Sequence, residues 1–185
     1  MYRQFDFNGN EVFHHDLQDK SVWCKDGENI EEGFINKYGE RLQLVLNPEK
    51  KSNRFAPDLF RTTDKRIADL KTQNTPFFKA GERYGIEPTY AVVFNIKDFV
   101  RYSDKYPDII IYFWVNWMVE RFVMNRKELS VKKISGVWMI EFKDIIQLSK
   151  NSPKHFYLQR KYDERGNAKG SYVFNIKDKV FKKVI

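Results

Sequence analysis

The chain of 185 residues has only one cysteine, six prolines and no apolar run long enough to cross a bilayer. The single cysteine, Cys24, excludes an internal disulfide framework and fits a reducing compartment. The longest apolar run, at 109–119, is interrupted by Asn116 and is too short for a membrane span. Residues 1–6 lead into no apolar segment of the signal-peptide type. We therefore expect a soluble, cytoplasmic protein that does not act in a membrane.

The short motifs of several common enzyme classes are also missing. The sequence contains no Walker loop, no dinucleotide-binding glycine pattern, no zinc-type spacing of cysteine and histidine, and no serine elbow. It has no repeat period of the solenoid type either. Any catalytic function must therefore rest on other side chains.

The composition is that of one folded domain with an uneven charge. Hydrophobic residues make up 42% of the chain and aromatic residues 16%, which argues against disorder and predicts a single domain over 1–185. The net charge is +8, but residues 121–185 hold 16 Lys/Arg against 6 Asp/Glu, whereas residues 1–120 hold 17 against 19. Such a basic segment attracts nucleic-acid phosphates, although a generic solvated cationic surface is the alternative interpretation.

The most informative stretch is 54–74, where two acids and a lysine have a meaningful spacing. Pro57-Asp58 opens a segment with apolar flanks, a polar run at 61–66 is typical of a turn, and residues 67–73 alternate. A strand has a period of two, so Asp69, Lys71 and Gln73 should share one face. If the two segments form a hairpin, Asp58 faces Asp69 across the pair. The alternative is an ordinary hairpin with solvated charges.

Two carboxylates and an ammonium at one point suit phosphodiester chemistry. Two adjacent carboxylates repel, and one pKa rises unless a divalent cation neutralises them. Oxygen ligands suit Mg²⁺ or Mn²⁺, which bind phosphate and activate water. A nearby lysine can hold a phosphate oxygen or stabilise charge in the transition state.

The pattern Pro57-Asp58…Asp69-Leu70-Lys71 resembles the PD-(D/E)xK nuclease superfamily. This resemblance implies that Asp58 and Asp69 bind Mg²⁺ (Mn²⁺ as the alternative) and that Lys71 assists hydrolysis. It also implies a metal-directed glutamate on the preceding helix, for which Glu31 is the best match and Glu32 the second. The resemblance covers about 28–95 and implies an α/β fold with a restriction-endonuclease-like core, a central mixed sheet flanked by helices. We place this core at about 27–120 and a β-rich basic extension at about 121–185.

The predicted elements follow the order that this core shows. Helices are expected at 27–38, with Gly39 as the stop, and at 77–85 and 143–148, the last capped by Asp144. Strands are expected at 41–46, 56–60, 67–73, 89–96, 109–117 and 137–142, and a hairpin at 155–176. The resemblance implies that the strand at 89–96 completes the central sheet. The hexapeptide at 93–98 recurs at 173–178, and we interpret both copies as a strand ending in a capping Asp.

The resemblance therefore implies a Mg²⁺-dependent deoxyribonuclease, an endonuclease of restriction or phage type. Gln73 is a candidate to orient a water or a phosphate. The predicted hairpin at 155–176 carries four cations among its tyrosines that suit DNA contact, namely Arg160, Lys161, Arg165 and Lys169. Cutting of both strands often needs two active sites, so a homodimer is an open alternative. The runner-up function is a non-enzymatic, basic nucleic-acid-binding protein in which the two acids are incidental.

Overall fold

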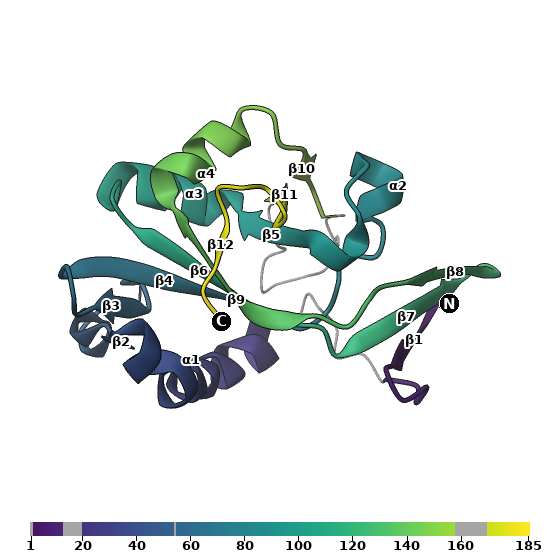
Figure 1. Ribbon diagram of the computed structural model, residues 1–185, viewed down its shortest axis with the longest axis horizontal. Helices are drawn as coiled ribbons and strands as arrows, with labels where there is room; N and C mark the ends of the chain where they lie inside the picture. Colours follow the sequence, from purple (N-terminus) through teal and green to yellow (C-terminus); the bar gives the residue numbers. More distant parts are fainter. Residues whose placement is uncertain (1, 13–19, 54, 158–169) are drawn as a thin grey trace.

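A computed structural model describes residues 2–12, 20–53, 55–157 and 170–185, with the side chains of the first helix described from Ile30 onward. It has a mixed α/β architecture built on three sheets (Figure 1). The helices are α1 (Lys20–Leu42), η1 (Pro48–Lys51), α2 (Ala80–Tyr84), η2 (Pro88–Tyr90), α3 (Ile96–Lys105) and α4 (Phe142–Ser149). Among the described residues, no helix is both long and apolar enough to cross a membrane.

The central sheet has six strands in the order β12-β9-β6-β4-β3-β2. Their bounds are β2 (Leu44–Leu46), β3 (Leu59–Arg61), β4 (Arg66–Gln73), β6 (Ile110–Asn116), β9 (Ser135–Glu141) and β12 (Lys182–Lys183). β4 and β6 are parallel and the other neighbours are antiparallel, so the sheet is mixed, as predicted. Since β9 and β12 come from 121–185, this sheet reaches beyond the segment of about 27–120 that was predicted to hold the core.

Two smaller sheets complete the part of the chain that the structure describes. One joins β10 (Lys154–His155), β11 (Ser171–Asn175) and β5 (Ala91–Asn95). The other joins β1 (Tyr2–Asp6), β7 (Val119–Met124) and β8 (Lys127–Ser130), and it projects from the body as an arm (Figure 1). The prediction that 89–96 belongs to the central sheet is therefore wrong: β5 pairs with β11, while β6 takes the place beside β4.

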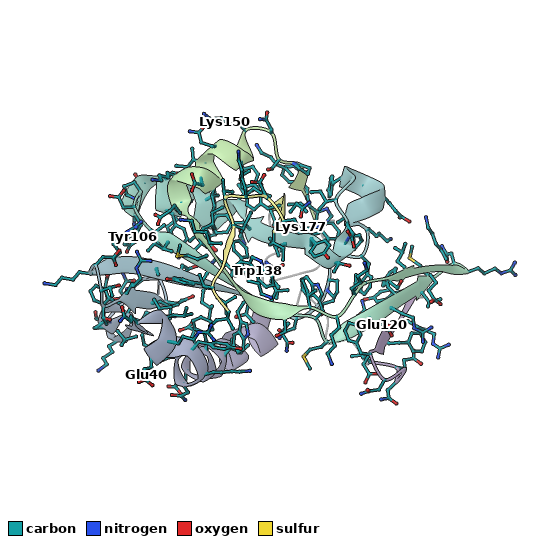
Figure 2. All side chains as sticks on the ribbon, viewed as in Figure 1. Glu40, Tyr106, Glu120, Trp138, Lys150 and Lys177 are labelled. Carbon is teal, nitrogen blue, oxygen red and sulfur yellow. The ribbon has the colours of Figure 1, made fainter. Side chains whose placement is uncertain are left out.

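The two faces of the central sheet are buried against different layers. In β6, Ile110 and Tyr112 pack on the side of α1, whereas Ile111 and Phe113 pack into the larger core with α3, α4, β5 and β11. This alternation follows from the period of two of a strand covered on both faces. In Figure 2, the buried Trp138 of β9 lies near the middle of the view, and the exposed Glu40 lies on the outer side of α1.

The first helix differs from its prediction at both ends. It begins at Lys20 rather than Gly27, and it passes through Gly39 to Leu42. Gly39 is needed for close packing, because a Cβ there would lie 2.9 Å from the carbonyl oxygen of Leu44. The turn after the helix is made by Gln43 instead, whose φ of 54° is left-handed.

Other helix and strand ends are set by local hydrogen bonds and backbone geometry. β3 starts at Leu59 rather than Ala56, because Pro57 has no N–H for a ladder and Ala56 N donates to Asn53 O. α4 begins after Glu141 without a side-chain cap, so the expected cap by Asp144 is wrong. α2 ends at Gly85 in the left-handed conformation, as its glycine predicts.

The repeated hexapeptide has a structural role in both copies. β5 and β11 pair antiparallel, and the first residue of one copy, Val93, lies opposite the first residue of the other, Val173. The cap is made by the asparagine and not by the aspartate: Asn95 Oδ1 accepts from Lys97 N, and Asn175 Oδ1 accepts from Lys177 N. The predicted capping role is therefore wrong for Asp98, whose carboxylate contacts Lys71 and Arg101, whereas Asp178 Oδ1 does accept from the backbone N–H of Val180 at 3.2 Å.

Candidate active site

Asp58 and Asp69 lie opposite one another at the start of the β3–β4 pair. Leu59 is in register with Ala68, and the same register continued by one residue brings Asp58 to Asp69. The backbone N–H of Asp58 points to Asp69 Oδ1 at 3.4 Å, and the N–H of Leu70 points to Asp58 Oδ2 at 3.4 Å. The convergence of the two acids predicted from the alternating strand is therefore confirmed in the geometry.

The two carboxyls are held in an environment that opposes their ionisation. Asp69 is 2% exposed, and burial followed by the negative charge of Asp58 raises the pKa of Asp69 to about 6, against the opposing effect of Lys71. Burial, and then the charge of Glu31, also raises the pKa of Asp58, although Lys71 and Lys50 oppose this shift. A buried carboxyl and a partly buried one, both with raised pKa values, form the kind of site that a cation stabilises.

Lys71 lies on the same face of β4 as Asp69, one period further along. Its Nζ is 2.7 Å from Asp69 Oδ2 and 2.6 Å from Asp98 Oδ2. Burial alone would lower the pKa of the Lys71 ammonium, but the charges of Asp69 and Asp98 raise it well above its ordinary value. Lys71 is therefore a fixed cation at neutral pH and is unsuited to act as a general base.

The sequence did not identify the residues that hold Lys71 from the other side. Asp98 lies in the first turn of α3, and its Oδ1 accepts from Arg101 Nη2 at 3.1 Å. Arg101 Nη2 also donates to the hydroxyl of Tyr102 at 2.7 Å, and Tyr102 is fully buried. The repeated hexapeptide did draw attention to Asp98, but nothing in its local sequence shows that α3 packs over β4.

Glu31 is joined to the two aspartates through a second lysine. Lys50 Nζ donates to Glu31 Oε1 at 2.7 Å, to Glu31 Oε2 at 2.6 Å and to Asp58 Oδ1 at 2.6 Å. Glu31 is partly buried beside Phe34, whereas Glu32 is exposed, so the structure turns Glu31 toward the aspartates. The sequence pattern does not identify Lys50 as this link, because Lys50 lies 19 residues from Glu31 in the chain.

Four carboxylates and three cations thus form one continuous network with a net charge of −1 when all are ionised. In order, the network joins Glu31, Lys50, Asp58, Asp69, Lys71, Asp98 and Arg101. Among the residues with described positions, no three acidic, histidine or cysteine side chains form a ready metal cage. The donor chemistry still suits a hard divalent cation, because Asp58 and Asp69 present oxygen ligands, with Asp69 Oδ2 already facing the Lys71 ammonium at 2.7 Å.

The remaining predicted residues have different outcomes. Gln73 Nε2 donates to Val93 O at 2.9 Å, and Gln73 Oε1 accepts from Val93 N at 3.2 Å. Both ends of its amide therefore join β4 to β5, which gives Gln73 a structural role in place of the expected contact with water or phosphate. The four cations of the predicted hairpin lie outside the described residues, namely Arg160, Lys161, Arg165 and Lys169. His155 pairs with Ser171, so the described ends of that hairpin do meet.

Comparison of this chain with family models, with curated proteins and with solved structures finds no match. The assignment of a function therefore depends on the geometry of the network itself.

Proposed function

We propose that this protein is a Mg²⁺-dependent deoxyribonuclease with a restriction-endonuclease-like core, an endonuclease of restriction or phage type. The observation that carries the proposal is the meeting of Asp58, Asp69 and Lys71 at one end of the β3–β4 pair. Glu31 supports it, because it comes from a helix that precedes these strands and shares a cation with Asp58. Helix, strand, strand and strand follow in the order that the superfamily pattern implies.

Asp58 and Asp69 would hold the metal ion, with Glu31 completing its ligands. Mg²⁺ or Mn²⁺ at such a site lowers the pKa of a bound water and neutralises charge on a phosphate. Lys71 supplies a permanent positive charge beside Asp69, where it binds a phosphate oxygen and stabilises the negative charge of the transition state. Asp98 and Arg101 hold the Lys71 ammonium in place from α3.

DNA binding is supported by charge. The chain carries a net charge of +8, with the excess concentrated in 121–185, and such an excess gives sequence-independent affinity for phosphates that falls with salt. The network itself is slightly negative, so a phosphate needs the metal ion to approach it. Cutting of both strands by this single site would require two copies, which a homodimer supplies.

A non-enzymatic nucleic-acid-binding protein is the second candidate. One observation favours it: Lys50 and Lys71 already give each site carboxylate a cationic partner, as in a purely structural ion-pair network. Both candidates predict salt-sensitive binding to DNA, and only the first predicts cleavage.

The test is a cleavage assay on plasmid, linear duplex and single-stranded DNA with Mg²⁺, Mn²⁺ or EDTA. Wild type is compared with Asp69→Asn and Lys71→Ala, and with two matched controls on the exposed end of α3, Asp104→Asn and Lys105→Ala. We expect metal-dependent cutting by wild type and both controls. Each site variant should lose activity by about 100-fold or more, because it removes a charge that acts on the transition state. DNA binding in EDTA should persist in all five proteins.

Absence of cutting under every condition, with DNA binding that the site variants leave unchanged, would refute the nuclease and favour the binding protein. Cutting that survives Asp69→Asn would show a contaminating enzyme or a different site. The products distinguish nicking, double-strand cutting and exonuclease action.

A further inference from the structure

Lys50 is held at the candidate site by a rigid connection. It lies on η1, whose cap residue Asn47 is buried and donates from Nδ2 to Pro57 O at 2.9 Å. The N–H of Asn47 also donates to Asp58 O at 2.9 Å. The turn that carries Lys50 is therefore tied directly to the segment that carries Asp58, and the approach of the lysine to that carboxylate is set by the fold.

The ammonium of Lys50 uses its full donor capacity on carboxylates. An ammonium has three N–H donors, and the three contacts of Nζ go to both oxygens of Glu31 and to Asp58 Oδ1, all within 2.6–2.7 Å. A cation that joins a helix glutamate to a strand aspartate in this way lies where a metal ion held by both acids would lie. The side chain of Lys50 is still 23% exposed, so it has a path back to solvent.

We propose that Lys50 is a built-in counter-ion of the site and that a divalent cation displaces its ammonium from Glu31 and Asp58. This inference rests on the proposed function, because it assigns the exchange to the same metal site. Mg²⁺ needs the carboxylate lone pairs at about 2.0–2.1 Å, and Lys50 Nζ occupies those of Glu31 and one of Asp58. Two cations cannot share these oxygens in a partly buried site without strong repulsion. Metal entry and Lys50 release are therefore one event.

The exchange accounts for two features of the metal-free geometry. Glu31 is joined to Asp58 through Lys50, so the ammonium orients it toward this aspartate in the place of a metal ion. Lys50 also separates two like charges that would otherwise repel, so the acids stay in place before the metal binds. Once displaced, its ammonium remains beside the site and can contact a phosphate oxygen of the substrate.

The first experiment is a calorimetric Mn²⁺ titration of three full-length proteins: wild type, Lys50→Met and Lys51→Met. Lys51 is the control because it lies on the same short helix and is exposed. Removal of the competing ammonium should lower the Mn²⁺ dissociation constant of Lys50→Met by at least about tenfold, while Lys51→Met matches wild type. Equal or weaker Mn²⁺ binding by Lys50→Met would overturn the exchange.

The second experiment uses wild type alone, so it stands even where Lys50→Met folds poorly. Amine acetylation followed by mass spectrometry compares the labelling of Lys50 with that of Lys51 in EDTA and in saturating Mg²⁺. Displacement should raise the ratio of Lys50 to Lys51 labelling several-fold when Mg²⁺ is present. An unchanged or lower ratio would overturn the proposal.

The outcomes separate this inference from the nuclease. If wild type cuts DNA with Mg²⁺ and Lys50→Met binds Mn²⁺ like Lys51→Met, only the counter-ion role fails. If Lys50→Met binds Mn²⁺ more tightly but no protein cuts DNA, the exchange stands and the nuclease reaction fails. If neither wild type nor Lys50→Met binds Mn²⁺, both fail.

Discussion

Asp69→Asn should make the metal-free protein more stable at neutral and alkaline pH. The carboxyl of Asp69 has a pKa of about 6 in the folded protein against an ordinary value of 3.8, because it is buried and lies beside Asp58. The folded state therefore holds the proton more tightly than the unfolded chain does. Stability from this group is present at low pH and is lost as pH rises through about 6. An asparagine keeps the neutral form at every pH.

The pKa shift of Asp69 sets the size of the expected gain in stability. Each pKa unit corresponds to about 1.4 kcal/mol, so a shift from 3.8 to about 6 makes the ionised Asp69 unfavourable by about 3 kcal/mol in the folded state. We therefore expect Asp69→Asn to raise the free energy of unfolding by about 3 kcal/mol near pH 8, and by less than about 1 kcal/mol near pH 4. The gain should shrink when Mg²⁺ is added, because the metal stabilises only the ionised wild-type site.

Urea unfolding in EDTA at several pH values between these limits measures the difference directly. Asp104→Asn serves as the control, because Asp104 is exposed and should give no comparable pH-dependent gain. A variant that is no more stable than wild type near pH 8, or a gain that does not fall toward pH 4, would refute the reasoning from burial.

Two further predictions follow from named contacts. Asp98→Asn removes one of the two carboxylates that hold the Lys71 ammonium. The single-turnover cleavage rate should therefore fall by about tenfold or more, with little change in DNA affinity. An unchanged rate would show that Asp69 alone positions Lys71. Phe34→Ala empties a fully buried position between α1 and the central sheet, where Phe34 packs against Trp114. Urea unfolding should show a loss of about 3–5 kcal/mol, whereas a loss below about 1 kcal/mol would mean that the layer under α1 contributes little.

The local sequence pattern was sufficient to predict β4 and the side chains that share its face. The alternation of 67–73 fixed which residues of β4 share a face, because a strand has a strict period of two. The polar run at 61–66 predicted the turn, and the two together brought Asp58 opposite Asp69. The apolar runs at 109–117 and 137–142 likewise predicted β6 and β9.

Local pattern was misleading where a residue has more than one use. Gly39 is a typical helix stop, yet here it permits close contact with Leu44 O inside a continuing helix. Gln73 lies on the same face of β4 as Asp69 and Lys71, but its side-chain amide forms hydrogen bonds with the backbone of β5. A side chain is assigned to structure or to chemistry by what packs against it, and the local sequence does not contain that information.

The sequence by itself determined which side chains meet at the start of the β3–β4 pair: two carboxylates and a lysine on a predicted hairpin. The tertiary structure alone decided their surroundings. Lys50 reaches Glu31 from 19 residues away, and Asp98 reaches Lys71 from 27 residues away. Strand period and turn composition act over a few residues, whereas the packing of η1 and α3 against the sheet depends on the whole core. Burial, which raises the pKa of Asp69, is likewise a property of the folded protein and not of the motif.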